Sequence, residues 1–176
     1  RTHNLTLSLT DTIASAADIA TLDSKTSGSL TVSSGTITGN ATQLKAIYAD
    51  GVGTGTTTTI TGLGSEAMTV TGGLSVADFN ILAAATDQLI TATISDTDAT
   101  TLKTLAETGH NLTITISDTT VAATDISAID ALTASTVTVT SGTISGSNTE
   151  LLAVNTLKTA GSTITAADVA KTITNP

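Results

Sequence analysis

The sequence contains no cysteine and almost no aromatic residues, with one Phe, one Tyr and no Trp among 176 residues. The lack of cysteine excludes disulfides and thiolate metal sites. A globular core of this size normally uses several aromatic side chains to fill irregular space. The apolar residues here are mainly Leu, Ile, Val and Ala, which suits a narrow core whose cross-section is repeated many times.

Basic residues are also scarce, with six Lys and Arg against fifteen Asp and Glu, which gives a net charge of −9. The six are scattered along the chain, so we expect no nucleic-acid partner. No apolar run approaches the ~20 residues that a membrane span needs, so no span is expected. The single proline and the regular aliphatic spacing argue against a mucin-like or disordered segment. Because the chain begins with Arg1, we expect a processed product or a fragment.

A long internal repeat organises the chain. The segment His3–Thr6 recurs as His110–Thr113, and this offset of 107 residues holds without a gap for more than forty residues. Ser34–Ile37, for example, recurs as Ser141–Ile144. Self-similarity at a fixed offset is the signature of a repeat architecture, so fold prediction starts from this repeat.

A shorter period lies inside the repeat. Aliphatic residues alternate with Thr or Ser in segments that begin near residues 5, 30, 68, 90, 112 and 137. Alternation of this kind predicts half-buried strands with the aliphatic side chains pointing inward. Most steps are about 22–25 residues, and the longer step holds a Gly/Thr insertion at 51–67 with an expected short strand around Thr58–Thr61.

A turn and a helix start follow the strands. The turn position is Asp or Gly, which suggests a conformation that both residues tolerate. Capping boxes or close variants predict helix starts at Ser15, Asn40, Ser75, Ser147 and Thr165. Asp98 is a lone capping residue in the same register, whereas Ala122 breaks the pattern. Near the end of the sequence, residues 164–173 contain a predicted helix start that has no full strand before it.

These patterns predict one α/β domain over residues 1–176. Strand, turn and helix recurring every ~22–25 residues predict a right-handed solenoid with one parallel β-sheet, similar in architecture to leucine-rich repeats but without their consensus. The Thr/Ser/Gly/Asp-rich segments 30–39 and 93–102 resemble tandem repeats of giant bacterial cell-surface proteins, such as those of marine cyanobacteria. The resemblance implies an extracellular layer, fibre or adhesin stalk, and it transfers no functional residues.

Candidate chemical sites are few. The histidines His3 and His110 are repeat equivalents that we expect roughly 20 Å apart, at about 5 Å per coil, and we interpret them as turn residues rather than ligands. No nucleophile elbow accompanies the many Ser and Asp residues, so no catalytic residues and no enzyme are expected. Gly51-x-Gly-x-Gly lacks the Lys of a phosphate loop, so we expect no cofactor-binding residues and no small-molecule substrate.

Two alternatives remain open. Asp11, Asp96, Asp98 and Asp118 form an acidic series that suits Ca²⁺ chemistry, although no known calcium-loop pattern is present and we assign no metal ligands. Outward threonines, such as Thr113 and Thr115, would form columns on a flat sheet, as in ice-binding solenoids. The sequons at Asn4, Asn40 and Asn111 are weak signals in so Thr-rich a chain.

The sequence therefore predicts an extracellular or cell-surface structural module. Because no coil can bury its own apolar face, we expect the module to continue end to end, as tandem repeats or as a homopolymer that builds a layer, stalk or filament. Its expected partner is itself. An ice-binding or calcium-dependent adhesin solenoid is the alternative.

Overall fold

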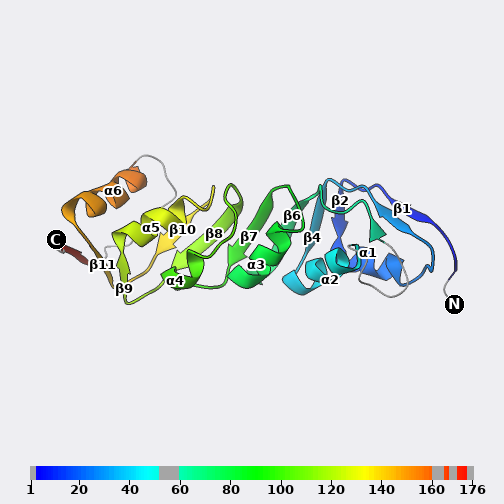
Figure 1. The fold of residues 1–176 in the computed structure, drawn as a ribbon, viewed down its shortest axis with the longest axis horizontal. Helices are drawn as coiled ribbons and strands as arrows, with labels where there is room; N and C mark the ends of the chain where they lie inside the picture. Colours follow the sequence, from blue (N-terminus) through cyan, green and yellow to red (C-terminus); the bar gives the residue numbers. More distant parts are fainter. Residues whose placement is uncertain (1–2, 52–59, 160–164, 167–169, 174–176) are drawn as a thin grey trace. The chain divides into compact units, whose positions relative to one another are not determined.

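A computed structural model describes residues 3–51, 60–159, 165–166 and 170–173. The chain forms two compact units, one of residues 1–72 and 81–92 and the other of residues 73–80 and 93–176. Parallel strands alternate with helices along the sequence (Figure 1), so the predicted mixed α/β class with parallel pairing is confirmed. The expectation of a single domain over residues 1–176 stays a prediction.

The first unit holds two coils and the strands of a third. Its complete elements are β1 (Leu7–Leu9), β2 (Ile13–Ser15), α1 (Ala16–Asp23), β3 (Leu30–Val32), β4 (Thr36–Gly39), α2 (Ala41–Gly51) and β5 (Ile60–Thr61). Strands β1, β3 and β5 form one parallel sheet. Strands β2 and β4 pair with the start of β6 (Ala67–Leu74) in another. Helices α1 and α2 pack against β4 (Figure 1).

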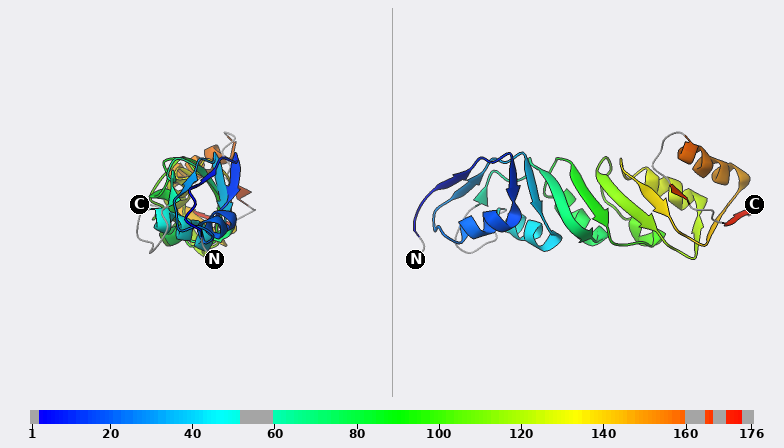
Figure 2. Two further views of the ribbon diagram at one scale, coloured as in Figure 1. Left: turned by 90° about the vertical axis from the view of Figure 1, so that its right-hand side faces the viewer. Right: turned by 180° about the vertical axis from the view of Figure 1, so that it is seen from behind.

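The second unit repeats this arrangement. Its complete elements are α4 (Ala99–Leu102), β8 (Asn111–Ile116), β9 (Thr120–Ala122), α5 (Ala123–Asp130), β10 (Val137–Val139), β11 (Thr143–Gly146), α6 (Asn148–Thr159), β12 (Thr165–Ala166) and β13 (Ala170–Ile173). Strands β8, β10 and β12 are parallel neighbours, and so are β9, β11 and β13. Helices α5 and α6 pack side by side (Figure 2). Helix α3 (Val76–Ala83) and strand β7 (Ile90–Ile94) have residues in both units.

The expectation of one parallel sheet is wrong, because each unit contains two. The second strand of a coil, such as Thr36–Gly39, follows a Ser-Gly turn and comes directly before a helix cap, so the sequence there reads as a turn. In the structure Ile37 of this strand is fully buried and pairs with Ala14 in the coil before it. A coil therefore bends twice, and both of its straight segments pair with neighbouring coils.

The strand predicted to begin near residue 68 is present, but Met68–Val70 does not follow the strand at Leu30 in the sheet. This segment pairs with β4, where Met68 lies opposite Ile37, and not with the strand at Leu30. The place opposite Leu30 belongs to Ile60 of β5, which confirms the described part of the short strand expected around Thr58–Thr61. Alternation fixes which face a residue points to, but it does not say which neighbour the strand pairs with. Residues 52–59 of the predicted insertion lie outside the described residues.

The helix start predicted at Thr165 is wrong as well. Thr165 belongs to β12, where it lies opposite Thr138, and β13 follows at Ala170–Ile173. Thr165 is β-branched and occupies the strand position of its coil, so parallel pairing overrides the weak capping pattern. Residues 167–169, which include the second half of that pattern, lie outside the described residues.

The core is built from the predicted alternation. In β7 the residues Ile90, Ala92 and Ile94 are buried, whereas Thr91 and Thr93 between them are exposed. The helices contribute one buried stripe each, which includes Ile19, Leu44 and Ile126. Phe79, the only phenylalanine, is fully buried. The small, uniform core inferred from the lack of aromatic residues is therefore present in both units.

The predicted helix caps mostly form. Asn40 and Gln43 make a complete reciprocal box, with bonds of 2.9 and 3.0 Å. Ser147 and Glu150 do the same at 3.4 and 2.8 Å. Ser15, Ser75 and Asp98 accept backbone N–H groups of their own helices, and Ala122 provides no side-chain cap, as expected. No helix within the described ranges is long and apolar enough to cross a membrane.

Candidate stacking interface

The repeat brings the same coil into two different environments. We call residues 3–25 the first coil and residues 110–132 the repeated coil, because the offset of 107 relates them. The inward residues of the repeated coil, Leu112, Ile114 and Ile116, are each 0% exposed. Their burial shows that this coil is covered on both of its stacking sides. Comparison of the two coils therefore identifies the contacts that a covered coil makes and an uncovered coil lacks.

One side of each coil is engaged in the same way in both units. A threonine four residues before the next strand places its hydroxyl between two coils. Thr133 Oγ1 accepts N–H groups from Leu112 and Ser135, both at 3.0 Å, and donates to Leu112 O at 2.7 Å. Thr26 makes the equivalent contacts with Leu5 and Gly28. Thr26 is buried and Thr133 is half-buried, and each hydroxyl replaces water for backbone groups that the strands leave unpaired.

The other side of the repeated coil is covered by residues 73–80 and 93–109, which we call the covering segment. Phe79 of this segment packs edge-on against the ring of His110, with ring centroids 5.4 Å apart and an interplanar angle of 74°. The Ser117 N–H donates to Thr97 O at 2.9 Å. The covering segment thus meets the repeated coil through both an apolar contact and backbone hydrogen bonding.

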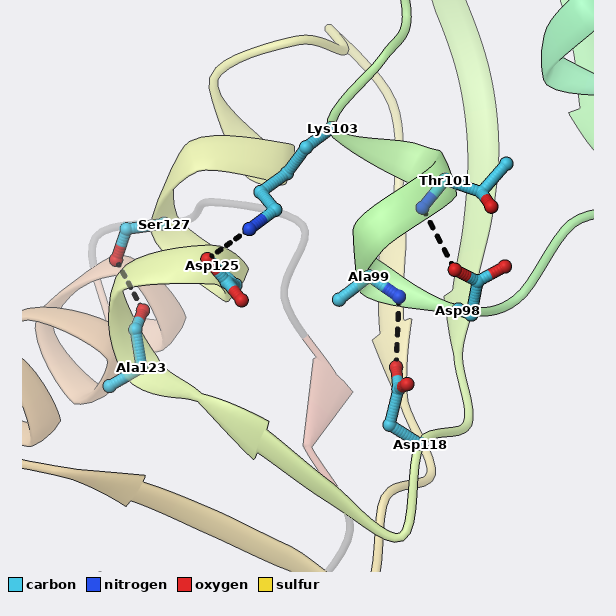
Figure 3. A network of polar contacts seen from close by, with 8 residues as sticks. All are labelled: Asp98, Ala99, Thr101, Lys103, Asp118, Ala123, Asp125 and Ser127. Carbon is cyan, nitrogen blue, oxygen red and sulfur yellow. Dashed lines mark hydrogen bonds and ion pairs between the residues drawn. The ribbon is translucent and has the colours of Figure 1, made fainter.

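Two carboxylates of the repeated coil complete this contact (Figure 3). Asp118 Oδ2 accepts the N–H of Ala99, the first residue of α4, at 2.9 Å. Lys103, which follows α4, places its Nζ 2.8 Å from Asp125 Oδ1 on α5. Asp118 therefore satisfies a free N–H at the start of a neighbouring helix, and Asp125 pairs with the cation at its end.

The covering segment is itself held in shape by local bonds. Asp98 accepts the Thr101 N–H at 2.8 Å (Figure 3), and this bond lowers the pKa of the exposed Asp98 carboxyl. Asn80 donates to Thr104 O at 2.9 Å and accepts the Ala106 N–H at 2.8 Å, which fixes the chain just after α4. The short helix α4 therefore has a defined position from which Ala99 and Lys103 reach the repeated coil.

No described residue outside the first coil covers the equivalent side of that coil. We call this side the open face, and it consists of His3, Leu5, Leu7, Leu9, Asp11 and Asp18, the repeat equivalents of His110, Leu112, Ile114, Ile116, Asp118 and Asp125. Leu5 is 55% exposed, where Leu112 is 0% exposed. Leu7 and Leu9 are half-buried, and His3, Asp11 and Asp18 are exposed. The open face thus has the same kinds of apolar and charged side chains as the covered side of the repeated coil, but these side chains are exposed or half-buried.

The structure accounts for the Asp and Gly exchange at the turns differently from the sequence. The φ of Gly35 and of Gly142 is not positive. A Cβ at these glycines would lie 3.3 Å from Thr12 O and 3.1 Å from Thr119 O, so glycine lets two coils approach closely. Where aspartate stands, as at Asp118, the side chain caps a helix of the adjacent coil. Close stacking therefore favours glycine at positions 35 and 142, whereas Gly72 has a φ of 82°, a backbone conformation that itself favours glycine.

The aspartates considered for Ca²⁺ are engaged with backbone groups. Asp96 accepts the Val76 N–H at 2.7 Å, and Asp98 and Asp118 accept the amides described above. Asp11 is exposed on the open face. Within the part of the chain that the structure describes, no group of three or more His, Asp or Glu residues is placed to hold a metal. Calcium binding stays a prediction.

The remaining sequence candidates are dispersed. His3 is exposed in the first unit, whereas His110 in the second is buried and lies 3.4 Å from Glu107. The outward Thr column is present within each unit, since Thr31 lies opposite Thr61, and Thr115 opposite Thr138. The asparagines of the three sequons, Asn4, Asn40 and Asn111, are exposed, exposed and half-buried. Most of Gly51-x-Gly-x-Gly lies outside the described residues.

The first unit also contains a cavity of about 260 Å³, lined by Lys45, Tyr48, Ala49, Ile81, Leu82, Ala84 and Ala85. The Tyr48 hydroxyl donates to the buried Glu66 carboxylate at 3.1 Å, and Glu66 also accepts the Gly64 N–H at 2.8 Å. Burial, reinforced by the neighbouring carboxylate, raises the pKa of Tyr48 far above its usual value. The cavity wall is mainly apolar, so it suits packing rather than acid–base chemistry.

Sequence reasoning missed the contacts that join coils. The threonines that bond across coils, Thr26, Thr86 and Thr133, each precede a strand by four residues, and this spacing was a usable signal. The cross-coil caps at Asp96 and Asp118 had no local signal, because their partners lie 20 and 19 residues away.

Comparison with protein families, curated proteins and solved structures finds no match for this chain.

Proposed function

We propose that this chain is an extracellular structural module that builds a surface layer, stalk or filament by end-to-end continuation of right-handed α/β coils. The observation that carries the proposal is the open face. Leu5 is 55% exposed there, although its repeat equivalent Leu112 is completely buried under a neighbouring coil. Exposed apolar strand edges of this kind favour continued pairing.

A solenoid is the arrangement that best suits these contacts. Within each unit, consecutive coils pair in parallel through two strand positions and pack their helices side by side. Connections between parallel strands of one sheet are right-handed in about 98% of cases. A chain of such coils gains stability from each interface between neighbours, so lengthening it is favourable at every step.

The composition supports a place outside the cell. The chain has six Lys and Arg among 176 residues and many exposed Thr and Ser side chains. A surface of this kind offers few sites to trypsin-like proteases and resembles that of giant bacterial surface proteins. Antibodies against this chain should therefore label intact cells of its source, and labelling only after permeabilisation would contradict the location.

The architecture is tested by making tandem chains of one, two and three copies of the 107-residue repeat. Each repeat carries strand starts near residues 5, 30, 68 and 90. At the ~4.8 Å spacing of paired strands, each added copy should lengthen the particle by roughly 20 Å at constant width. Small-angle X-ray scattering measures both dimensions. Particles that grow equally in all directions would exclude the solenoid.

Ice binding is a second candidate, favoured by the outward Thr column. Ser8, Thr31 and Thr61 lie in register, and the Thr31 and Thr61 hydroxyl oxygens are 3.2 Å apart. In the second unit Thr115 lies opposite Thr138, and the backbone of Thr165 is in register with Thr138. Ice grown with micromolar protein should be faceted if this column binds ice. Unshaped discs would leave the column as an outward strand surface.

A further inference from the structure

The contacts of the repeated coil show which groups the open face would need in a partner. In the repeated coil, Leu112, Ile114 and Ile116 are buried, Asp118 caps the start of α4, Asp125 pairs with Lys103 and His110 packs against Phe79. In the first coil four of the six equivalent side chains are identical, and the other two, Ile114 and Ile116, are replaced by the aliphatic residues Leu7 and Leu9. The open face therefore keeps the complete set of groups that recognises a covering segment.

Charge narrows the choice of occupant. The net charge of the chain is −9, and two of its acidic residues, Asp11 and Asp18, lie on the open face beside an apolar strand. A partner must therefore bring apolar side chains together with positive charge. The covering segment does so through Phe79, the Ala99 N–H at the start of α4 and Lys103, which is one of only six Lys and Arg residues.

A second copy of this chain does not supply that partner. Its covering segment already lies against its own residues 110–132, through the Phe79, Ala99 and Lys103 contacts. We infer that the open face binds a coil with the chemistry of residues 73–109, contributed by a further repeat joined ahead of His3. This inference rests on the proposed structural function and names the partner of its interface.

The test joins a copy of residues 73–109 directly ahead of His3, in place of residues 1–2. The added Gly109 then precedes His3 as the original Gly109 precedes His110. Amide exchange at Ser8 is the readout. The Leu7 N–H and the Leu9 carbonyl both bond to the β3 side, each at 2.9 Å, so the Ser8 N–H points away from β3 toward the open face.

Ser8 exchange should slow at least tenfold in the extended chain, because a new strand accepts its N–H. The amide of Thr115, its repeat equivalent, should exchange at the same rate in both chains. Unchanged exchange at Ser8 would overturn the inference. Slowing at Ser8 in the unextended chain that increases with protein concentration would make a second copy the occupant and would overturn it as well.

A charge exchange tests the chemistry of the contact. Lys103→Glu in the added copy should reduce Ser8 protection about two- to fivefold, the range expected for an exposed ion pair. Asp18→Lys in the same chain should restore the protection, whereas Lys103→Glu at the original position should leave Ser8 unchanged. Failure of the restoration would remove the ion pair from the inferred contact.

This experiment separates the inference from the proposed function. Tandem chains that lengthen as expected, with Ser8 unprotected in the extended chain, would keep the structural module and overturn the assigned partner. Tandem chains that do not lengthen would contradict the module itself, whatever happens at Ser8.

Discussion

The sharpest mutational test compares one substitution at two repeat-equivalent leucines. Leu112→Ala removes a side chain that is 0% exposed, and Leu5→Ala removes the same side chain where it is 55% exposed. Truncation of a fully buried leucine costs about 2–5 kcal/mol, because both transfer energy and a residual cavity contribute. At the half-exposed Leu5 no enclosed cavity is left, and about half of the ~2.4 kcal/mol for three methylene-sized groups is at stake, so we expect roughly 1 kcal/mol or less.

Urea unfolding followed by circular dichroism measures both costs, since the single Tyr gives little fluorescence change. Each variant should be measured at two protein concentrations a factor of ten apart. The expected result is a midpoint that falls much further for Leu112→Ala than for Leu5→Ala, at both concentrations. Equal costs at the lower concentration would show that the open face is covered in the free chain, and would refute the reasoning from the repeat.

Four further predictions follow from individual contacts. Thr133→Val should cost about 1–3 kcal/mol, because it leaves buried backbone groups of two coils unpaired, whereas the exposed Thr113→Val should cost under about 0.5 kcal/mol in the same urea assay. Asp118→Ala should cost about 0.5–2 kcal/mol through loss of the α4 cap, measured by thermal unfolding, and an unchanged Tm would remove the cap from the stacking contact. Folding raises the pKa of Tyr48 above its ordinary value of 10.0, so Tyr48 contributes stability that is fully present below pH 10 and is lost as the pH rises further. Tyr48→Phe should weaken this loss of stability at alkaline pH. Identical profiles of stability against pH for the two proteins would contradict the burial effect. The carboxylates of Asp96 and Asp118 already accept backbone N–H groups, so we expect a chelator to leave the Tm unchanged. A Tm lowered by the chelator would show that the chain binds Ca²⁺.

Local sequence signals predicted local structure well. The strands Leu30–Val32, Ile90–Ile94 and Val137–Val139 were expected from aliphatic and Thr alternation, and the boxes at Asn40 and Ser147 were expected from spacing alone. In each case the signal in the sequence lies within a few residues along the chain. Periodicity and capping are physical properties of a single strand or helix, so one sequence suffices to find them.

Contacts between coils were much harder to predict. The second strand at Thr36–Gly39 exists because Ile37 pairs with Ala14 in the preceding coil, and the pairing of Met68 with Ile37 depends on where the insertion at 51–67 ends. Similarly, Asp118 differs from an ordinary turn aspartate only through Ala99, a partner in another coil. The stacking interface emerged from the repeat, which places the same residues once in a covered coil and once in an open one.

The length of tandem chains tests the stacked α/β solenoid most directly. Chains of one, two and three 107-residue repeats should give scattering profiles with a constant cross-section and a length that increases by roughly 20 Å per repeat, as paired strands at ~4.8 Å require. A cross-section that widens with repeat number, or a radius of gyration that follows the ~0.38 power of chain length found for compact globules, would contradict the solenoid.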